Sequence, residues 1–324
     1  MIIGRSPLRI TLGAGGTDVP SYYEKFDGFC ISAAINQYVY TTIHKTCADE
    51  MLLRYSQIER VKSVNDIQHP IIREALKLTG ITQANIEITS LADQGSGTGL
   101  GSSGSFTTAL LKTLHKFKKQ NIAPKELAEM ACHIELGILH EPIGKQDQNA
   151  AAYGGLTVFD FLRTGEIKVR PLNVSESIVH QLEENLVMFH TGIFRSASSV
   201  LKEQNDKSKS NDADMINNLH FIKDLGYQSL DALESGNLIK FAEIMNTHWE
   251  WKKKRSSKMS NPNIDKWHAL GLTNGAIGAK VIGAGSGGFL MFYTEEKLRL
   301  RKAMQSEGLE EMEVRFDYEG TKIL

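Results

Sequence analysis

Apolar residues recur at regular intervals along most of the chain, and the intervals predict strands and helices around one central loop. Residues 84–90 alternate between apolar and polar as a half-buried strand does, and apolar residues between 106 and 117 recur at helical spacing. The stretch between them, residues 95–104, reads Gly-Ser-Gly-Thr-Gly-Leu-Gly-Ser-Ser-Gly. The chain therefore predicts a glycine-rich loop that leads from a strand into the N-terminus of a helix.

The same periodicities predict further elements on both sides of this loop. Strands are expected at the start of residues 7–18, in 29–47, 156–161, 167–171, 186–190 and 312–316, and as the two arms of a turn in 279–293. Helices are expected in residues 68–79, from Pro124 onwards and in 215–249. The polar stretch 203–214 predicts an exposed loop or a helix junction.

Composition is that of an ordinary globular enzyme and argues against several functions. The chain has 324 residues, of which 41% are hydrophobic and 23% charged, so two domains are expected. A net charge of -1 argues against a nucleic-acid partner. The three cysteines lie far apart, which argues against a disulfide scaffold and a structural zinc site. Since no apolar run approaches ~18 residues, we expect a cytoplasmic protein without a membrane partner.

The central loop has the features of a phosphate site. A helix N-terminus presents unpaired N–H groups and the positive end of the helix dipole, and glycines let the backbone approach phosphate oxygens closely. Ser102 and Ser103 place hydroxyls where a phosphate-bound Mg²⁺ would sit. A flexible glycine-serine loop is the alternative. The loop has no P-loop lysine, and it fits a Rossmann fingerprint poorly in position and acidic partner.

Five other stretches each allow a structural and a functional interpretation. Glycines at 13–16 lead to Asp18, which either caps a tight turn or accepts hydrogen bonds from a substrate's hydroxyl groups. Glycines at 283–288 serve a turn or a close backbone approach. Glu135, beside the apolar stripe of a helix, is either a solvated flank or close to the buried side, and Asp147 either caps a helix or reaches a cleft. The basic run 252–255 is either a solvated helix face or a phosphate-binding edge.

The three glycine clusters, in this order, resemble the motifs of the GHMP small-molecule kinases. The middle cluster resembles Pro-x-Gly-x-Gly-Leu-Gly/Ser-Ser-Ser-Ala, with Gly95 in place of proline, and residues 280–288 resemble Lys-x-x-Gly-Ala-Gly-x-Gly-Gly. The first cluster resembles the galactokinase motif at Arg9, Leu12, Thr17 and Asp18. The resemblance implies an α+β fold with a ribosomal-protein-S5-like N-terminal domain (1–185), a ferredoxin-like C-terminal domain (186–324) and an active site between them.

Roles follow from the resemblance, with ATP and Mg²⁺ as cofactors. It implies that Asp147 accepts the proton of the attacking hydroxyl or orients that hydroxyl, with Arg9 beside it. Ser103 and Glu135 would bind the metal. The residues implied to bind the nucleotide phosphates are Gly97, Gly99, Leu100, Gly101, Ser102, Ser103 and Gly104.

The substrate is implied by a departure from galactokinase, which has Glu-His where this chain has Gly15-Gly16. Residues 13–20, 191–197 and 253–257 resemble the D-glycero-D-manno-heptose 7-phosphate kinase branch, which phosphorylates O1 to form the 1,7-bisphosphate for surface polysaccharides. The residues expected to bind substrate are Gly15, Gly16, Thr17, Asp18, Lys145, Arg195 and Gly285; Lys145, Arg195 and Lys253 are the candidates for its phosphate.

Other functions stay open at this point. The alternatives are another anomeric kinase, of the fucose, N-acetylhexosamine or galactose type, and a non-catalytic galactokinase-like sensor of sugar and ATP. A homodimer is left open as well.

Overall fold

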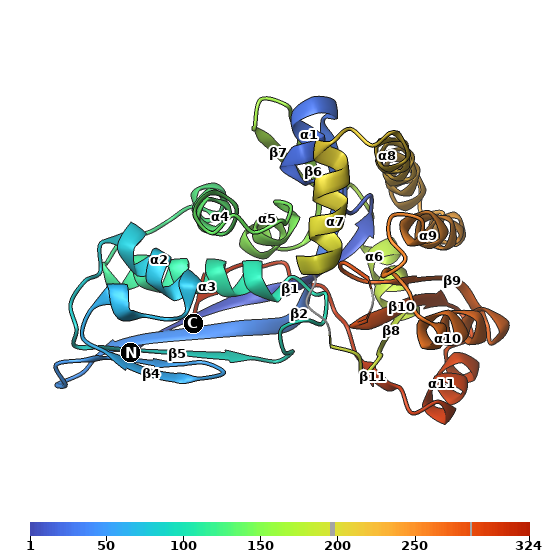
Figure 1. The fold of residues 1–324 in the computed structure, drawn as a ribbon. Helices are drawn as coiled ribbons and strands as arrows, with labels where there is room; N and C mark the ends of the chain where they lie inside the picture. Colours follow the sequence, from blue (N-terminus) through green and yellow to red (C-terminus); the bar gives the residue numbers. More distant parts are fainter. Residues whose placement is uncertain (195–197, 286) are drawn as a thin grey trace.

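The computed structural model describes residues 1–194, 198–285 and 287–324, which form two sheets with helices packed against them (Figure 1). The strands are β1 (Ile2–Gly13), β2 (Gly28–Lys45), β3 (Met51–Arg54), β4 (Ile58–Val61), β5 (Ile86–Ala92), β6 (Leu156–Phe161), β7 (Ile167–Pro171), β8 (Leu186–His190), β9 (Ala276–Val281), β10 (Phe289–Thr294), β11 (Glu310–Met312) and β12 (Lys322–Ile323). The helices are α1 (Pro20–Phe26), α2 (Pro70–Thr79), α3 (Ser102–Phe117), α4 (Pro124–Cys132), α5 (Gln146–Tyr153), α6 (Glu176–Asn185), α7 (Ser198–Lys209), α8 (Ala213–Glu234), α9 (Leu238–Lys253), α10 (Pro262–Thr273) and α11 (Lys297–Ser306). A 3₁₀ turn, η1 (Val64–Asp66), and a π-helical turn, η2 (His133–Ile138), complete the set.

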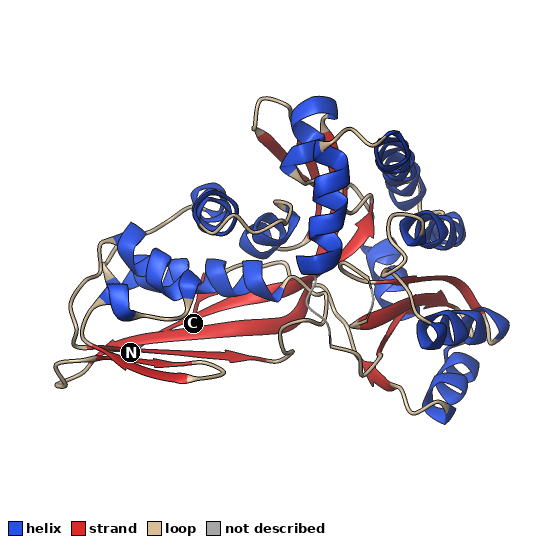
Figure 2. Ribbon diagram, viewed as in Figure 1, coloured by secondary structure: helices blue, strands red, loops and turns tan. Residues whose placement is uncertain are grey.

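The first sheet is organised around the long strand β2. Its order is β12-β1-β2-β5-β3-β4, and β6 pairs with the other half of β2 and with β7. All of these pairings are antiparallel except that of β3 with β5. Helices α2 to α5 lie over one face of this sheet (Figures 1 and 2). The sheet thus positions both elements that flank the central glycine loop. Strand β5 precedes the loop and belongs to the sheet, and α3 follows the loop and packs over the sheet.

The second sheet has the order β11-β8-β10-β9 and is antiparallel throughout. It begins at Leu186, whereas β12 at the end of the chain returns to pair with β1 in the first sheet. The domain boundary near residue 185 stays a prediction. Leu8, Ile10 and Leu12 of β1 belong to one buried cluster with Ile222 of α8 and Met291 of β10, so a shared core fixes the two sheets against each other.

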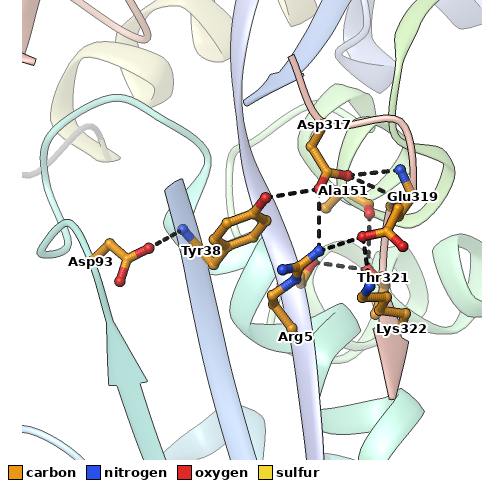
Figure 3. Close-up of polar contacts among 10 residues, drawn as sticks. Arg5, Tyr38, Asp93, Ala151, Asp317, Glu319, Thr321 and Lys322 are labelled. Carbon is orange, nitrogen blue, oxygen red and sulfur yellow. Dashed lines mark hydrogen bonds and ion pairs between the residues drawn. The ribbon is translucent and has the colours of Figure 1, made fainter. Parts of the chain in front are cut away.

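The end of the chain is bound to β1 and α5 by polar contacts (Figure 3). Arg5 donates to Glu319 at 2.7 Å and to Asp317 at 3.4 Å. The Thr321 hydroxyl donates to the carbonyl of Ala151 at 2.9 Å and shares a 2.8 Å hydrogen bond with the Ser6 hydroxyl. The C-terminal turn of α5 is therefore linked to β1 through Thr321, near the end of the chain.

The α+β fold and most of the predicted elements are confirmed, but the expectation for residues 203–214 holds only in part. The junction between α7 and α8 does lie there, with residues 210–212 exposed, but helix α7 runs through Lys209. Gln204 and Ser208, one turn apart, are buried and donate to the carbonyls of Gly16 and Ser21. Because the inward face of α7 is polar here, no apolar periodicity marks it as a helix. The strand expected at 312–316 is displaced: β11 spans Glu310–Met312, and beyond it Phe316 makes only an isolated bridge with Ile35.

None of the helices among the described residues has the length and apolar character needed to cross a bilayer.

Candidate active site

The three glycine clusters meet around one cleft of about 660 Å³, which is lined by elements of both sheets. A Cβ at Gly283 would lie 2.4 Å from the Cα of Gly99, and one at Gly288 would lie 2.1 Å from the carbonyl oxygen of Thr98. Both positions have positive φ. The third cluster therefore has glycines because its backbone packs directly on the central loop, a contact that any side chain would prevent.

Arg9 and Asp147 form an ion pair inside this cleft. The Nε and Nη2 atoms of Arg9 lie 2.7 and 2.6 Å from Oδ1 of Asp147, and Nη1 donates to the carbonyl of Gly99 at 2.7 Å. Both contacts use the same carboxylate oxygen. Among the described residues Oδ2 has no hydrogen-bond partner, so this oxygen is available to a substrate hydroxyl.

Helix α5 can place Asp147 in the cleft because α3 has a glycine, Gly104, where the two helices touch. A Cβ at Gly104 would lie 2.9 Å from the Cβ of Asp147. Leu100, one of the residues expected to bind nucleotide, has a buried side chain, and its carbonyl accepts a 2.9 Å hydrogen bond from the Arg9 backbone. These two residues shape the loop through their backbone and their packing.

A second carboxylate, Glu135, is fully buried next to the start of α3. The Ser103 hydroxyl donates to its Oε2 atom, and Gln148 Nε2 donates to Oε1 at 2.9 Å. Burial raises the pKa of Glu135 to about 7, although the hydrogen bonds from Ser103 and Gln148 act in the opposite direction. The carboxylate lies on the π-helical turn η2, a type of irregularity often found at functional sites.

The Ser103–Glu135 pair has the composition of a magnesium site. Mg²⁺ prefers oxygen ligands and is commonly held by one or two carboxylates together with phosphate oxygens of a substrate. One carboxylate and one hydroxyl at the N-terminus of α3 match that requirement, with the remaining ligands to come from phosphate and water. The residues present therefore fit the metal.

Asp18 links the first glycine cluster to the start of α5. Its Oδ2 atom accepts from the Gln146 backbone at 3.0 Å and its Oδ1 atom from the Gly16 backbone at 3.2 Å. Burial raises the pKa of this carboxyl group. Asp18 lines the cleft together with Gly15 and Gly16, so it both fixes the turn and faces the cavity. Its neighbour Thr17 is buried and bonds to the Phe29 carbonyl at 2.7 Å, which is a structural contact.

Not every predicted residue reaches the cleft. Lys145 lines a second cavity of about 370 Å³, with its Nζ atom 4.9 Å from the centre of the Tyr23 ring. Lys253 does not line the cleft, and its Nζ atom lies 2.8 Å from Glu250 and 3.8 Å from Asp265. Arg195 lies outside the described residues. Gly285 is not among the residues that line the cleft, and a Cβ there would lie 2.9 Å from the carbonyl oxygen of Met259.

The structure instead brings basic residues to the cleft that were not among the predicted site residues. Lys252 and Arg255, from the run 252–255, are buried and line the cavity, as does Lys280 of β9. The expectation of a solvated helix face is therefore wrong for half of that run. A signal was present in the sequence, since His248, Lys252 and Arg255 recur at the spacing of one helix face.

Two family models match the chain. GHMP kinases N terminal domain matches residues 65–155, and GHMP kinases C terminal matches residues 229–309, so that together they cover more than half of the chain. The first match contains the central loop, Glu135 and Asp147, and the second contains α9 and the third glycine cluster.

Similarity to individual proteins extends over the whole chain. A D-glycero-alpha-D-manno-heptose 7-phosphate kinase from Campylobacter jejuni is 28% identical over 98% of this chain and 97% of its own length. The crystal structure of a D-glycero-D-manno-heptose 1-phosphate kinase from Bacteroides thetaiotaomicron is 25% identical, with a TM-score of 0.80 over 100% of this chain and 99% of that one. A bifunctional fucokinase/GDP-fucose pyrophosphorylase from Arabidopsis thaliana is 24% identical over 92% of this chain and 30% of its own length.

Proposed function

The chain belongs to the GHMP kinase family, and from this premise we propose that it phosphorylates O1 of D-glycero-D-manno-heptose 7-phosphate to give the 1,7-bisphosphate. Its relatives are named as sugar kinases, and it is likewise a sugar kinase, which transfers phosphate to a hydroxyl acceptor. Kinases of this family use ATP, generally with Mg²⁺. The acceptor sugar and the hydroxyl that reacts are the proposed part.

The observation that carries the catalytic proposal is the Arg9–Asp147 pair at the base of the central glycine loop. Oδ2 of Asp147 takes the proton of the attacking hydroxyl, whose oxygen then bonds to the γ-phosphorus of ATP as the bond from that phosphorus to the β,γ-bridging oxygen breaks and ADP leaves. Arg9 orients the carboxylate by holding its other oxygen and ties it to Gly99 of the phosphate loop. Positioning of this kind dominates phosphoryl transfer.

The nucleotide phosphates are assigned to the loop at 97–104 and the N-terminus of α3, where backbone N–H groups converge. Ser103 and Glu135 would hold the metal, which neutralises charge on the transferring phosphate when it is bound. Gly15, Gly16 and Asp18 line the remaining part of the cleft and would contact the sugar. The absence of a side chain at Gly16 lets Arg255 approach the first glycine cluster, since a Cβ there would lie 2.5 Å from the Nη1 atom of Arg255.

The choice of the heptose phosphate as acceptor rests on the similarity to the Campylobacter protein. This similarity spans almost the full length of both chains. The similarity to a fucokinase keeps fucose as the second candidate. The names of the two heptose kinases differ in the position of the phosphate, at carbon 7 or carbon 1, so both sugar phosphates belong in any test.

The test is ADP release from Mg-ATP with a panel of acceptors: heptose 7-phosphate, heptose 1-phosphate, the unphosphorylated heptose, fucose and galactose. We expect turnover on the 7-phosphate with phosphate appearing on O1 by ³¹P NMR, and loss of turnover in Asp147→Asn. Turnover confined to the 1-phosphate or to fucose would refute the proposed acceptor but keep the kinase. ATP binding without turnover on any sugar would favour the sensor.

A further inference from the structure

One face of helix α9 presents basic side chains to the cleft instead of to water. His248 and Lys252 lie one turn apart on α9 and Arg255 lies in the turn that directly follows the helix; they are 6%, 7% and 3% exposed. Lys280, on the neighbouring strand β9, is 2% exposed. All four line the cavity that holds Asp147. We call these four residues the α9 basic cluster.

The two lysines of the cluster are hydrogen-bonded to neutral backbone groups. Lys252 Nζ donates to the carbonyls of Gly283 and, at 3.2 Å, Val281. Lys280 Nζ donates to the carbonyl of Leu12 at 2.8 Å. These contacts fix each ammonium group at the edge of a glycine cluster without neutralising its charge.

Arg255 is held in the same way. Its Nε atom donates to Asn218 Oδ1 at 2.9 Å, and both terminal nitrogens lie 3.3 Å from the Gly15 carbonyl oxygen. Throughout the described residues, no carboxylate oxygen lies within 4.0 Å of the charged nitrogens of Lys252, Lys280 or Arg255. Asp18 is the acidic residue that acts on Arg255 electrostatically, and its own oxygens are bonded to backbone N–H groups.

His248 supplies an independent sign of a ligand. Both of its ring nitrogens are buried without a hydrogen-bond partner among the described residues, although the side chain lines the cleft. Burial, together with the nearby charges of Lys280, Arg255 and Lys252, lowers the pKa of His248, so this side chain adds no positive charge of its own to the cluster.

Three buried cations without a counter-ion are costly for the fold. Burial lowers the pKa of Lys280 to about 7 and that of Arg255 to about 10, because charge is disfavoured away from water. A dianionic group in the cleft would offset this cost by pairing with the cations. The cluster is therefore suited to a phosphate group.

We propose that the α9 basic cluster binds the phosphate that the sugar already carries, in contrast to the phosphate that is transferred. The proposal rests on the proposed function, because it assumes a phosphorylated acceptor. Arg255 contacts Gly15 in the first glycine cluster, where the sugar is assigned, whereas the metal pair Ser103–Glu135 lies on α3 and η2. One ligand can thus place its reacting hydroxyl at Asp147 and its phosphate against α9.

The kinetic test compares Arg255→Met and Lys252→Met with Lys253→Met, a matched control whose ammonium pairs with Glu250 outside the cleft. We expect the KM for heptose 7-phosphate to rise at least about 30-fold in the first two variants, because each leaves a buried phosphate without a charged partner. The KM for ATP should rise much less than the KM for the sugar phosphate. An unchanged KM for the sugar phosphate, or a rise in the KM for ATP instead, overturns the assignment.

A binding test separates this inference from the proposed function. Inorganic phosphate is titrated calorimetrically into wild-type protein saturated with Mg-ADP, and into the same three variants. We expect binding that weakens at least about 30-fold in Arg255→Met and Lys252→Met and persists in Lys253→Met. Phosphate binding with this pattern, in a protein that does not turn over the heptose phosphate, leaves the site in place and refutes only the acceptor. Phosphate affinity equal in all four proteins overturns the site whatever the acceptor.

Discussion

Replacing Glu135 by glutamine should make the protein more stable at pH 8 while abolishing its activity. The carboxylate is fully buried, with a hydrogen bond to each oxygen, and burial raises its pKa to about 7 from an ordinary value of 4.5. Glutamine has the same shape and no charge. Its carbonyl keeps the hydrogen bond from Gln148, and its amide can donate to Ser103, because a hydroxyl can accept as well as donate.

The size of the effect follows from the two pKa values of Glu135. Between pH 4.5 and pH 7 the folded state keeps a proton that the unfolded state has lost, so stability falls as pH rises through this range. At about 1.4 kcal/mol per pH unit, the full loss is about 3 kcal/mol above pH 7. Glutamine does not titrate. The stabilising effect of Glu135→Gln should therefore be about 3 kcal/mol at pH 8 and smaller by about 2 kcal/mol at pH 5.

The assay is urea unfolding of both proteins without Mg²⁺ or nucleotide at pH 5 and pH 8, together with Mg-ATP turnover. Ser103→Ala is the matched control. It removes a hydrogen bond that favours the charged carboxylate, so it should lose activity and become less stable at pH 8. A glutamine variant no more stable than wild type at pH 8, or one whose advantage does not change with pH, would refute the argument that this buried carboxylate, the proposed metal ligand, is kept at the expense of stability.

Three other substitutions test separate parts of the site. Asp147→Asn should lower kcat at least about 100-fold with little effect on ATP affinity, measured by calorimetry. Thr321→Val should cost about 1 kcal/mol and lower kcat more than it raises KM, because it frees the end of α5; Thr321→Ser should restore both, and equal losses in the two variants would contradict this role. Lys280→Met should be more stable than wild type at pH 7, with an advantage that shrinks towards pH 10. Between the folded pKa of Lys280, about 7, and its ordinary value of 10.5, the unfolded state binds more protons than the folded state, so the stability of the wild type rises with pH. Urea unfolding at pH 7 and pH 10 measures this change. An advantage of the variant that is the same at both pH values would speak against a buried ammonium group.

The central loop was predictable because its signals are local. A strand pattern precedes residues 95–104 and a helix pattern follows them, so the loop and the start of α3 at Ser102 could be placed from the sequence. The partners of the loop were harder to identify. From the residues alone, Glu135 could be a solvated flank and Asp147 a cap. The packing of α5 on α3 at Gly104 brings Asp147 to the central loop, and the hydrogen bonds of Glu135 to Ser103 and Gln148 place that carboxylate beside the start of α3.

Helices with polar inner faces were the least predictable elements. Helix α7 buries Gln204, and α9 with the turn after it buries Lys252 and Arg255, although such residues are normally found in water. Their burial depends on carbonyl groups of Gly15, Gly16 and β9 that come from distant parts of the chain, so the sequence can indicate that the basic residues share a face but not that this face is buried. Buried polar faces of this kind are retained where a polar ligand binds, which is why the same residues define the cleft.

The misplacement of Lys145 shows how helix geometry constrains a motif. Residues two positions apart on a helix point about 200° away from each other, so Lys145 and Asp147 at the start of α5 could not both face one cleft. The structure places Asp147 in the cleft and Lys145 against Tyr23 in a second cavity, with Gln146 between them bonded to Asp18. A cation for the phosphate of a bound sugar must then come from another element. Helix α9 meets this requirement because its residues repeat on one face, and that periodicity was visible in the sequence before the fold was known.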